Sequence, residues 1–245
     1  MRHRVRYPGS GGSVSGEGSS GCVPPEAGGG WRPPSPGFFE SGALEVAERL
    51  VGCLLLTRSN DGTTGGVIVE TEAYTADDRA SHSYPGPTRR NASMFRRGGV
   101  AYVYVSYGVH YCFNVVTGPE GSGEAVLVRA IEPLAGLDLM IRRRGGADPL
   151  LLASGPGRLC EALGIDLRHD GTSLSGPDMT ILVRPRPAGM TVEASARIGI
   201  TKDAELKRRF FQSGSPYLSR RASGRGYRPG SSLAEPREGF PKRDS

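Results

Sequence analysis

Lysine is scarce in this chain. The 245 residues include 31 lysines and arginines, yet only Lys202, Lys207 and Lys242 are lysines. Chemistry that proceeds through a Schiff base needs a lysine amine in the active site. That reaction class is therefore restricted to three positions, of which Lys202 stands closest to a motif, the segment 196–199.

Cysteine pairs and long apolar runs are also missing. The four cysteines form no C-x-x-C pair, and His110 with Cys112 has no further metal-ligating residue at a suitable spacing. Neither a zinc ribbon, a disulfide framework nor a metal site is therefore predicted. No apolar run has the length of a signal peptide or a membrane span. We expect a cytoplasmic protein without a cofactor or membrane partner, nucleoid-associated if bacterial; targeting by the N-terminal tail stays open.

Apolar residues are few and unevenly spread. They make up 37% of the chain, which also contains 37 glycines and 19 prolines. Residues 1–36 are rich in Gly, Ser, Pro and Arg, and 223–245 are similarly biased, so neither segment buries enough apolar surface to offset its chain entropy. We predict disordered tails at 1–36 and 223–245 and one folded domain at 37–222. The net charge of +6 permits an anionic partner such as nucleic acid.

Within the predicted domain, β-prone segments outnumber amphipathic helical ones. Strands are predicted at 53–57, 66–74, 124–131, 181–183, 192–200 and near 210–211, and helices at 41–51, 134–144 and 154–164. Leu44 is expected on the apolar stripe of the helix at 41–51. Pro133 should end the strand at 124–131, and Ser154 should cap the helix at 154–164. Strands and helices do not alternate regularly. This favours an α+β fold, with a largely antiparallel sheet, a protruding β-hairpin and flanking helices, over a doubly wound one.

The most β-prone run, 100–116, is interrupted by Gly108 and is predicted to form two strands about a tight turn. Alternation places Tyr102 and Tyr104 on one face and Tyr107 at the apex. The aromatic residues of such a run usually pack inward. A ring at a hairpin tip beside arginine-rich loops is also the kind of wedge that minor-groove proteins insert between base pairs.

The strand at 67–74 carries acidic side chains among apolar ones. Alternation predicts that Ile68, Glu70, Glu72 and Tyr74 share one face, which is either exposed to solvent or the wall of a pocket. Glu72, beside Tyr74, is the candidate general base. Glu70 is expected to support it or to lie on the surface.

Three further polar side chains allow a structural and a functional interpretation. Arg129, inside an apolar strand, is the candidate partner of Glu72, but an ion pair with Glu132 is the simpler reading. His82 could stack on a ligand, donate a hydrogen bond or cap its loop. Asn114 could serve a ligand or satisfy backbone groups of the sheet.

A series of short motifs runs in order through the predicted domain. The motifs are Val69-Glu-Thr-Glu-Ala-Tyr74, His82-Ser83, Met94-Phe95, Tyr102-Val-Tyr104, Tyr107-Gly108, Asn114, Leu127-Val-Arg129-Ala-Ile-Glu-Pro133, Ser154-Gly-Pro156, Ala196-Arg-Ile-Gly199 and Gly214-Ser-Pro216. This series resembles the alkyladenine (3-methyladenine) DNA glycosylase family over residues 37–219. Each motif alone is weak, but this many in order at compatible spacing are highly specific.

The resemblance implies a monofunctional DNA glycosylase of base excision repair. Such an enzyme flips an alkylated or otherwise damaged purine out of double-stranded DNA and hydrolyses its N-glycosidic bond, which leaves an abasic site. Glu72 would be the general base that activates water, helped by Arg129 and the backbone carbonyl of Ile198. Nothing in the resemblance gives Lys202 a catalytic role, so the strand should stay intact.

The resemblance also assigns the DNA-binding groups, and it implies a monomer. The flipped base would stack between Tyr74 on one side and His82 with Tyr104 on the other, and Asn114 would disfavour the amino group of normal guanine. Tyr107 would fill the gap left in the duplex. Together with the amides of a helix N-terminus, two further side chains would hold a phosphate: these are Ser154 and Arg158.

Two rival functions remain open from the residues alone. Glu70 and Glu72 could be the paired carboxylates of a carbohydrate glycosidase, because alternate residues of a strand lie about 6.8 Å apart. Adjacent residues of one strand, however, approach a sugar poorly from two sides. The chain could also be a non-catalytic minor-groove DNA-binding module that uses Tyr107, which would leave Glu72 and Arg129 unexplained.

Overall fold

The computed structural model describes residues 30–219. The predicted C-terminal tail, 223–245, and most of the predicted N-terminal tail lie outside these residues. The packed region nevertheless begins before residue 37. Trp31 is buried against Leu54 and Leu182, and Arg32 forms a β-bridge with Val183. The ring of Trp31 anchors this segment. The composition of the segment did not indicate this packing.

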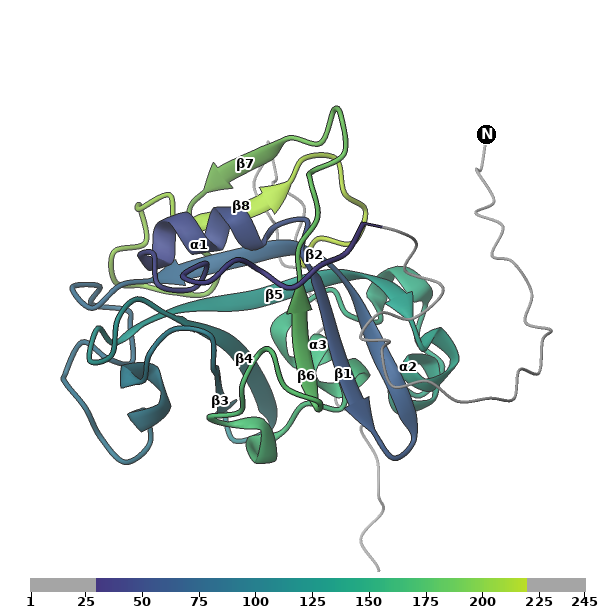
Figure 1. The fold of residues 1–245 in the computed structure, drawn as a ribbon, viewed down its shortest axis with the longest axis horizontal. Helices are drawn as coiled ribbons and strands as arrows, with labels where there is room; N and C mark the ends of the chain where they lie inside the picture. Colours follow the sequence, from purple (N-terminus) through teal and green to yellow (C-terminus); the bar gives the residue numbers. More distant parts are fainter. Residues whose placement is uncertain (1–29, 220–245) are drawn as a thin grey trace, which may run out of the picture.

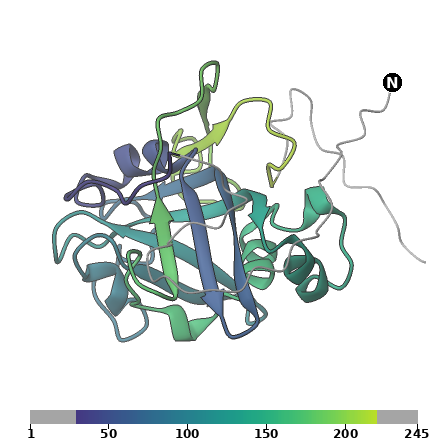
Figure 2. The same ribbon diagram turned by 45° about the vertical axis from the view of Figure 1, so that its right-hand side comes forward.

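One antiparallel sheet organises the domain. Its eight strands within the described residues are β1 (Leu54–Ser59), β2 (Gly62–Tyr74), β3 (Ala101–Ser106), β4 (His110–Thr117), β5 (Glu124–Ala135), β6 (Met179–Leu182), β7 (Val192–Ser195) and β8 (Arg209–Gln212). The order is β3-β4-β5-β2-β1-β6, and β8 pairs with both β2 and β7. Figure 2 shows β6, β1 and the first half of β2 side by side. The predicted α+β class with an antiparallel sheet is confirmed.

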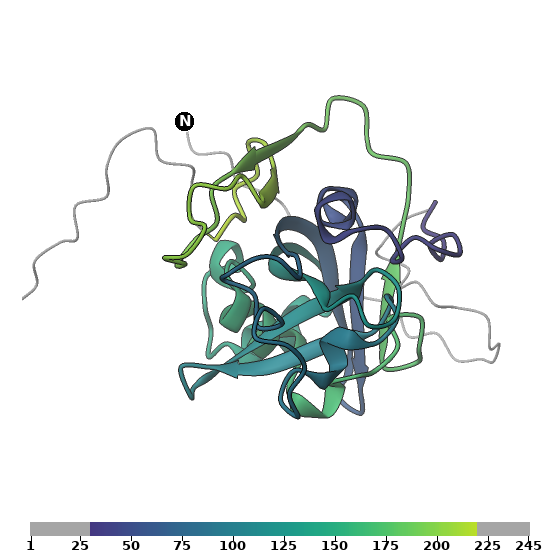
Figure 3. The ribbon, with the colours of Figure 1, turned by 90° about the vertical axis from the view of Figure 1, so that its left-hand side faces the viewer.

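Three α-helices pack against this sheet: α1 (Ala43–Leu50), α2 (Leu137–Arg143) and α3 (Pro156–Leu163). Short 3₁₀ helices lie at Ala92–Phe95, Pro149–Leu151 and Leu167–His169. Both α1 and α3 contribute side chains to the main hydrophobic core, so the sheet curls around a core that helices enter from two sides. Figure 1 shows α1 across β2 near β7 and β8, and Figure 3 looks along its axis. No helix within residues 30–219 is long and apolar enough to cross a membrane.

Strand β2 changes its neighbour halfway along one edge. That edge pairs with β1 up to Val67 and with β8 from Glu70 to Glu72, while β5 follows the other edge throughout. The register with β5 shifts on both sides of Glu70, as at a β-bulge. Ile68 and Ala73 consequently lie in the same core cluster. The prediction that Ile68 shares a face with Glu72 is wrong, because the bulge interrupts the alternation.

One predicted helix face and two predicted strand ends are also wrong. Leu44 is 43% exposed, and the buried stripe of α1 is formed by other residues: Ala43, Val46, Ala47 and Leu50. Strand β5 continues through Pro133, which lies beside a register shift where a missing N–H is tolerated. The strand predicted at 192–200 ends at Ser195. In each case tertiary contacts override a local pattern.

Helix α3 begins as the proline predicts but not with the expected cap. Its N-cap residue is Gly155 and Pro156 opens the first turn, while Ser154 is in a β-bridge with Ala130. The backbone of Gly155 has φ 141°, a value that favours glycine. The cap of α3 is therefore a backbone turn, and the hydroxyl of Ser154 is left for another partner.

Strands β3 and β4 form the hairpin predicted around Gly108. The amide of Val109 donates to the carbonyl of Ser106, and the two residues between them have φ of 51° (Tyr107) and 71° (Gly108). Two positive φ values in succession define a type I′ turn, whose twist suits a two-stranded hairpin. A positive φ is unusual for tyrosine, so the apex holds this ring in a strained backbone conformation.

Candidate active site

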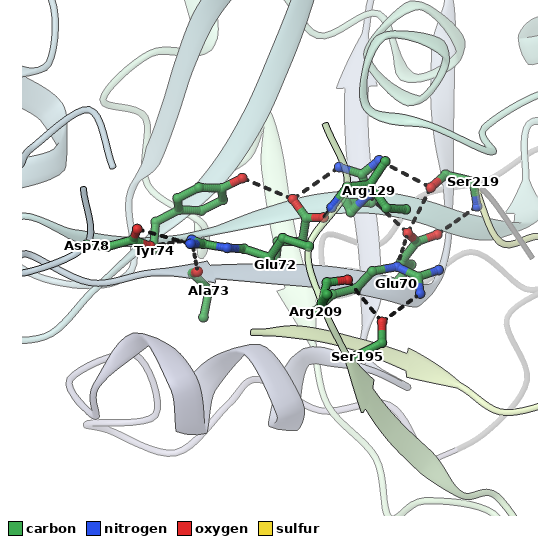
Figure 4. Close-up of polar contacts among 12 residues, drawn as sticks. Glu70, Glu72, Ala73, Tyr74, Asp78, Arg129, Ser195, Arg209 and Ser219 are labelled. Carbon is green, nitrogen blue, oxygen red and sulfur yellow. Dashed lines mark hydrogen bonds and ion pairs between the residues drawn. The ribbon is translucent and has the colours of Figure 1, made fainter. Parts of the chain in front are cut away.

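The carboxylate of Glu72 is completely buried and accepts three hydrogen bonds. The amide of Ile198 donates to Oε1 (2.7 Å), while the hydroxyl of Tyr74 (3.0 Å) and Nη1 of Arg129 (3.1 Å) both donate to Oε2. Figure 4 shows the two side-chain donors converging on Glu72. A carboxylate has about four acceptor positions. The arrangement therefore saturates Oε2 and leaves one position on Oε1.

Arg129 bridges the two glutamates of β2. Its Nε lies 3.0 Å from Oε1 of Glu70, and its Nη1 lies 3.1 Å from Oε2 of Glu72. Burial opposes the charge of Arg129, but the two carboxylates outweigh this effect and raise its pKa. Strand β5, hydrogen-bonded to β2, brings Arg129 across from the glutamates. Of the two partners considered from the sequence, Glu72 is the one it contacts; its ion pairs within the described chain do not include Glu132.

Glu70 is buried and fully engaged by donors. Oε1 accepts hydrogen bonds from Arg129, from Nε of Arg209 (2.8 Å) and from the hydroxyl of Ser219 (2.8 Å), and Oε2 accepts from the amide of Ser219 (2.6 Å). Burial favours the protonated form, yet Arg129 and Arg209 outweigh it and hold the pKa of Glu70 below its ordinary value. Glu70 was expected either to support Glu72 or to lie on the surface. It is not a surface residue, and it contacts Arg129, which in turn contacts Glu72.

A pocket of about 570 Å³ lies beside this buried cluster. The side chains of Tyr74, His82 and Tyr104 all line it. The rings of His82 and Tyr104 meet at 4.4 Å between centroids, and Nδ1 of His82 lies 2.9 Å from the hydroxyl of Tyr102. Burial raises the pKa of Tyr102 to about 12, so its hydroxyl stays protonated at neutral pH. A pocket of this volume, with tyrosine and histidine rings among its lining residues, is large enough for a small molecule.

Asn114 and Arg129 form part of the same lining. Asn114 is buried, and its Nδ2 donates to the carbonyl of Tyr102 at 3.0 Å, which orients the amide. Asn114 therefore satisfies a backbone group of the sheet, and it also borders the pocket. Cys112 also lines the pocket, and burial raises the pKa of its thiol. No group of three metal-ligating residues occurs within residues 30–219.

Tyr107 stands at the edge of the pocket, at the tip of the β3–β4 hairpin. Its side chain is 91% exposed, and it belongs to the pocket lining together with Tyr104 from the same hairpin. The inward packing that is usual for an aromatic run therefore does not occur at this position. A large exposed ring on a strained turn calls for a functional explanation.

The two predicted phosphate-binding side chains lie together near the pocket. Nη1 of Arg158 is 3.2 Å from the hydroxyl of Ser154, and Pro156, between them in sequence, lines the pocket. Arg158 is exposed and Ser154 is buried. The structure thus places both at the N-terminus of α3, beside the candidate site.

Several residues of the site were not predicted from the sequence. Arg209 and Ser219 complete the environment of Glu70, and Arg197 pairs with Asp78 behind Tyr74. Arg197 and Asp78 are separated by 119 residues in the chain. Arg197 lies within the motif 196–199, but no local pattern indicates that its partner is Asp78 or that Arg209 is buried.

Sequence comparisons with known proteins point to one family. The sequence profile of the methylpurine-DNA glycosylase family matches residues 37–216. A protein of Methanoculleus marisnigri is 53% identical over 187 residues, which cover 75% of this chain and 97% of that protein. Proteins of Nitrosospira multiformis (50% over 182 residues; 74% and 91%) and Rubrobacter xylanophilus (46% over 190 residues; 76% and 98%) are also similar. All three carry 3-methyladenine DNA glycosylase as a provisional name.

Proposed function

Because the chain belongs to the methylpurine-DNA glycosylase family, hydrolases of N-glycosyl bonds, we propose that it removes alkylated purines from double-stranded DNA by general-base hydrolysis with Glu72. The single observation that carries this proposal is the buried Glu72, held by Arg129, Tyr74 and the Ile198 amide next to an aromatic pocket. These donors fix the carboxylate in place.

In the proposed reaction a water molecule attacks C1′ of the deoxyribose. A bond forms between the water oxygen and C1′, the bond from C1′ to the purine nitrogen breaks, and the water proton passes to Glu72. The electron pair of the broken bond neutralises a cationic alkylated base, which then leaves as a neutral molecule. Oε1 is the acceptor atom, because Oε2 already takes hydrogen bonds from Tyr74 and Arg129. The backbone carbonyl of Ile198, assigned by the family resemblance, would hold the same water.

The target base must leave the helical stack to reach this group. Tyr107 is suited to fill the resulting gap, because it is exposed at the tip of a hairpin beside the pocket. The base then stacks on Tyr74 on one side and on His82 and Tyr104 on the other, since all three line the pocket. Aromatic faces attract cationic bases, which favours alkylated purines over normal ones. Asn114 would crowd the amino group of guanine.

The duplex is proposed to be held near the pocket by the N-terminus of α3. There Nη1 of Arg158 lies 3.2 Å from the hydroxyl oxygen of Ser154. The first amides of the helix provide further donors for a phosphate. The protein is proposed to act as a monomer. The product is proposed to be an abasic site in an intact strand, because Lys202 and Lys207 are exposed and do not line the pocket.

The rival carbohydrate glycosidase needs two available carboxylates. Glu70 is not available, because Arg129, Arg209 and Ser219 occupy its two oxygens. The non-catalytic module has no use for a fully buried, triply hydrogen-bonded acid beside a pocket. Both rivals are therefore disfavoured by the environment of the glutamates.

A Glu72→Gln variant tests the proposal directly. With methylated duplex DNA, we expect the variant to keep its affinity while release of free alkylpurine and formation of alkali-labile sites fall by about two to four powers of ten. Glu193→Gln, an exposed glutamate on β7, is the matched control and should release base at the normal rate. Unchanged release by the Glu72 variant would rule out this residue as the base, and binding without release by the unmodified protein would support the module.

A further inference from the structure

The ring of Tyr74 has a cation behind it. One side of Tyr74 lines the pocket, whereas the guanidinium carbon of Arg197 lies 4.6 Å from the ring centroid. The side chain of Arg197 is completely buried and does not belong to the pocket lining. The residue therefore stacks on the face of Tyr74 that a flipped base does not use.

The edge of the Arg197 guanidinium is fixed by acceptors. Its two terminal nitrogens pair with the two oxygens of Asp78, and Nη1 also donates to the carbonyl of Ala73 at 3.0 Å. Such in-plane pairing leaves the flat face of the guanidinium free to cover the ring. Asp78 is also completely buried, so solvent screens this pair little.

A cation on one face of an aromatic ring affects a ligand on the other face. It draws π-electron density toward itself, and it directly repels a second cation on the opposite face. Both effects weaken the binding of a cationic base more than the binding of a neutral base. Two unit charges about 8 Å apart across a ring change a binding constant by roughly tenfold or more at a protein dielectric of about 20. Asp78 opposes this effect, because its carboxylate neutralises much of the charge of Arg197.

We propose that the Arg197–Asp78 pair behind Tyr74 sets the preference of the pocket between cationic and neutral damaged purines. The inference rests on the proposed function, since it assumes that a flipped purine stacks on Tyr74. Arg197 alone would lower the affinity of the pocket for cationic bases such as 7-methylguanine. Asp78 restores their binding, so removal of the carboxylate should shift the preference toward neutral bases such as hypoxanthine.

Equilibrium binding in a Glu72→Gln background tests this proposal without interference from base release. Dissociation constants are measured for two duplexes that differ only at one position, 7-methylguanine or hypoxanthine. Asp78→Asn should lower the preference for 7-methylguanine by about three- to tenfold. Adding Arg197→Gln to Asp78→Asn removes both charges and should restore the preference to the level of the Glu72→Gln protein or above it.

Arg208 provides the matched control, because it lies 3.2 Å from the same carboxylate but contacts no ring within residues 30–219. Arg208→Gln should change the preference less than Asp78→Asn does, because Arg208 does not stack on the ring of Tyr74. If Arg197 only holds the Ile198 segment in place, both duplexes lose affinity equally and the preference is the same in all variants. That result would overturn the inference while base release by the unmodified protein still supported the proposed function.

Discussion

The main-chain amide of Ile198 donates a 2.7 Å hydrogen bond to Oε1 of Glu72, although 126 positions separate the two residues. This contact joins the segment after β7 to the C-terminal end of β2, so the acid is held from the main chain as well as from side chains. The orientation of Glu72 therefore depends on the register of the sheet and on a loop. It follows that each donor to Glu72 can be tested separately.

Tyr74→Phe removes one side-chain donor and leaves the ring in place. We expect lesion binding to persist, whereas base release should fall by roughly ten- to a hundredfold, because a hydrogen bond to a charged group contributes about 1.5–3 kcal/mol. Single-turnover release from a methylated duplex measures the change. Tyr104→Phe is the control, since that hydroxyl contacts Cys112 and not Glu72. Equal losses in both variants would show that the Tyr74 hydroxyl does not act through Glu72.

Arg129→Met removes the only cation that contacts both glutamates of β2 within the described chain. Breaking a buried ion pair from one side costs about 3–5 kcal/mol, because it leaves a buried charge uncompensated. We expect a corresponding drop in the free energy of unfolding, measured by urea denaturation, together with a loss of base release. Arg129→Lys keeps the charge, but one ammonium group cannot reproduce the forked contacts, so its stability should be intermediate.

Arg168→Met controls for the loss of a positive charge in itself. Arg168 pairs with Asp166 at the surface, and its side chain is 85% exposed. Its replacement should leave the urea midpoint where it is. An Arg129→Met protein as stable as this control would show that the buried network does not depend on Arg129.

Glu70→Gln should make stability depend less on pH. The pKa of Glu70 lies below its ordinary value of 4.5. Its carboxylate therefore contributes stability that is fully present above pH 4.5 and is lost as the pH falls through the lowered pKa. We expect the unmodified protein to exceed Glu70→Gln in unfolding free energy at pH 7 by about 3 kcal/mol, with the gap closing in acid.

Urea denaturation at pH 7, 4.5 and 3 measures this convergence. Glu45→Gln is the control, because Glu45 forms an exposed ion pair with Arg49 within α1. Its curve should run parallel to that of the unmodified protein. A gap between the Glu70 variant and the unmodified protein that stays constant with pH would mean that Glu70 stabilises the fold through packing and not through its charge.

The sequence was sufficient for the parts of the site that depend on local pattern. Alternation along β2 placed Glu70, Glu72 and Tyr74 together, and the break at Gly108 placed Tyr107 at the apex of a hairpin. These features need only the period of a strand and the chemistry of a turn. The bulge beside Glu70 was not predictable, because one extra residue changes neither composition nor β-propensity, and Ile68 was misplaced as a result.

The environment of the glutamates depended on long-range register. Arg209 reaches Glu70 because β8 takes the edge of β2 that β1 leaves, and Ser219 follows from the path of the chain after β8. Neither residue lies in a pattern that differs from a surface segment. A buried arginine is recognisable only once the carboxylate that balances its charge is known.

Tyr107→Gly separates the stability of the hairpin from its proposed action on DNA. Glycine adopts the φ of 51° at this position without steric cost, whereas tyrosine does not. We expect the free energy of unfolding to stay the same or to rise by up to about 1 kcal/mol. Binding to lesion-containing duplex should weaken by one to two powers of ten, because a stacked ring contributes about 1–3 kcal/mol.

Val109→Ala alters an apolar side chain of the same turn that is 74% exposed, and it should affect binding much less. Thermal denaturation and fluorescence-detected DNA binding measure the two effects. If the glycine variant bound lesion DNA as tightly as the unmodified protein, Tyr107 would not be the wedge, and its strained, exposed ring would need another explanation.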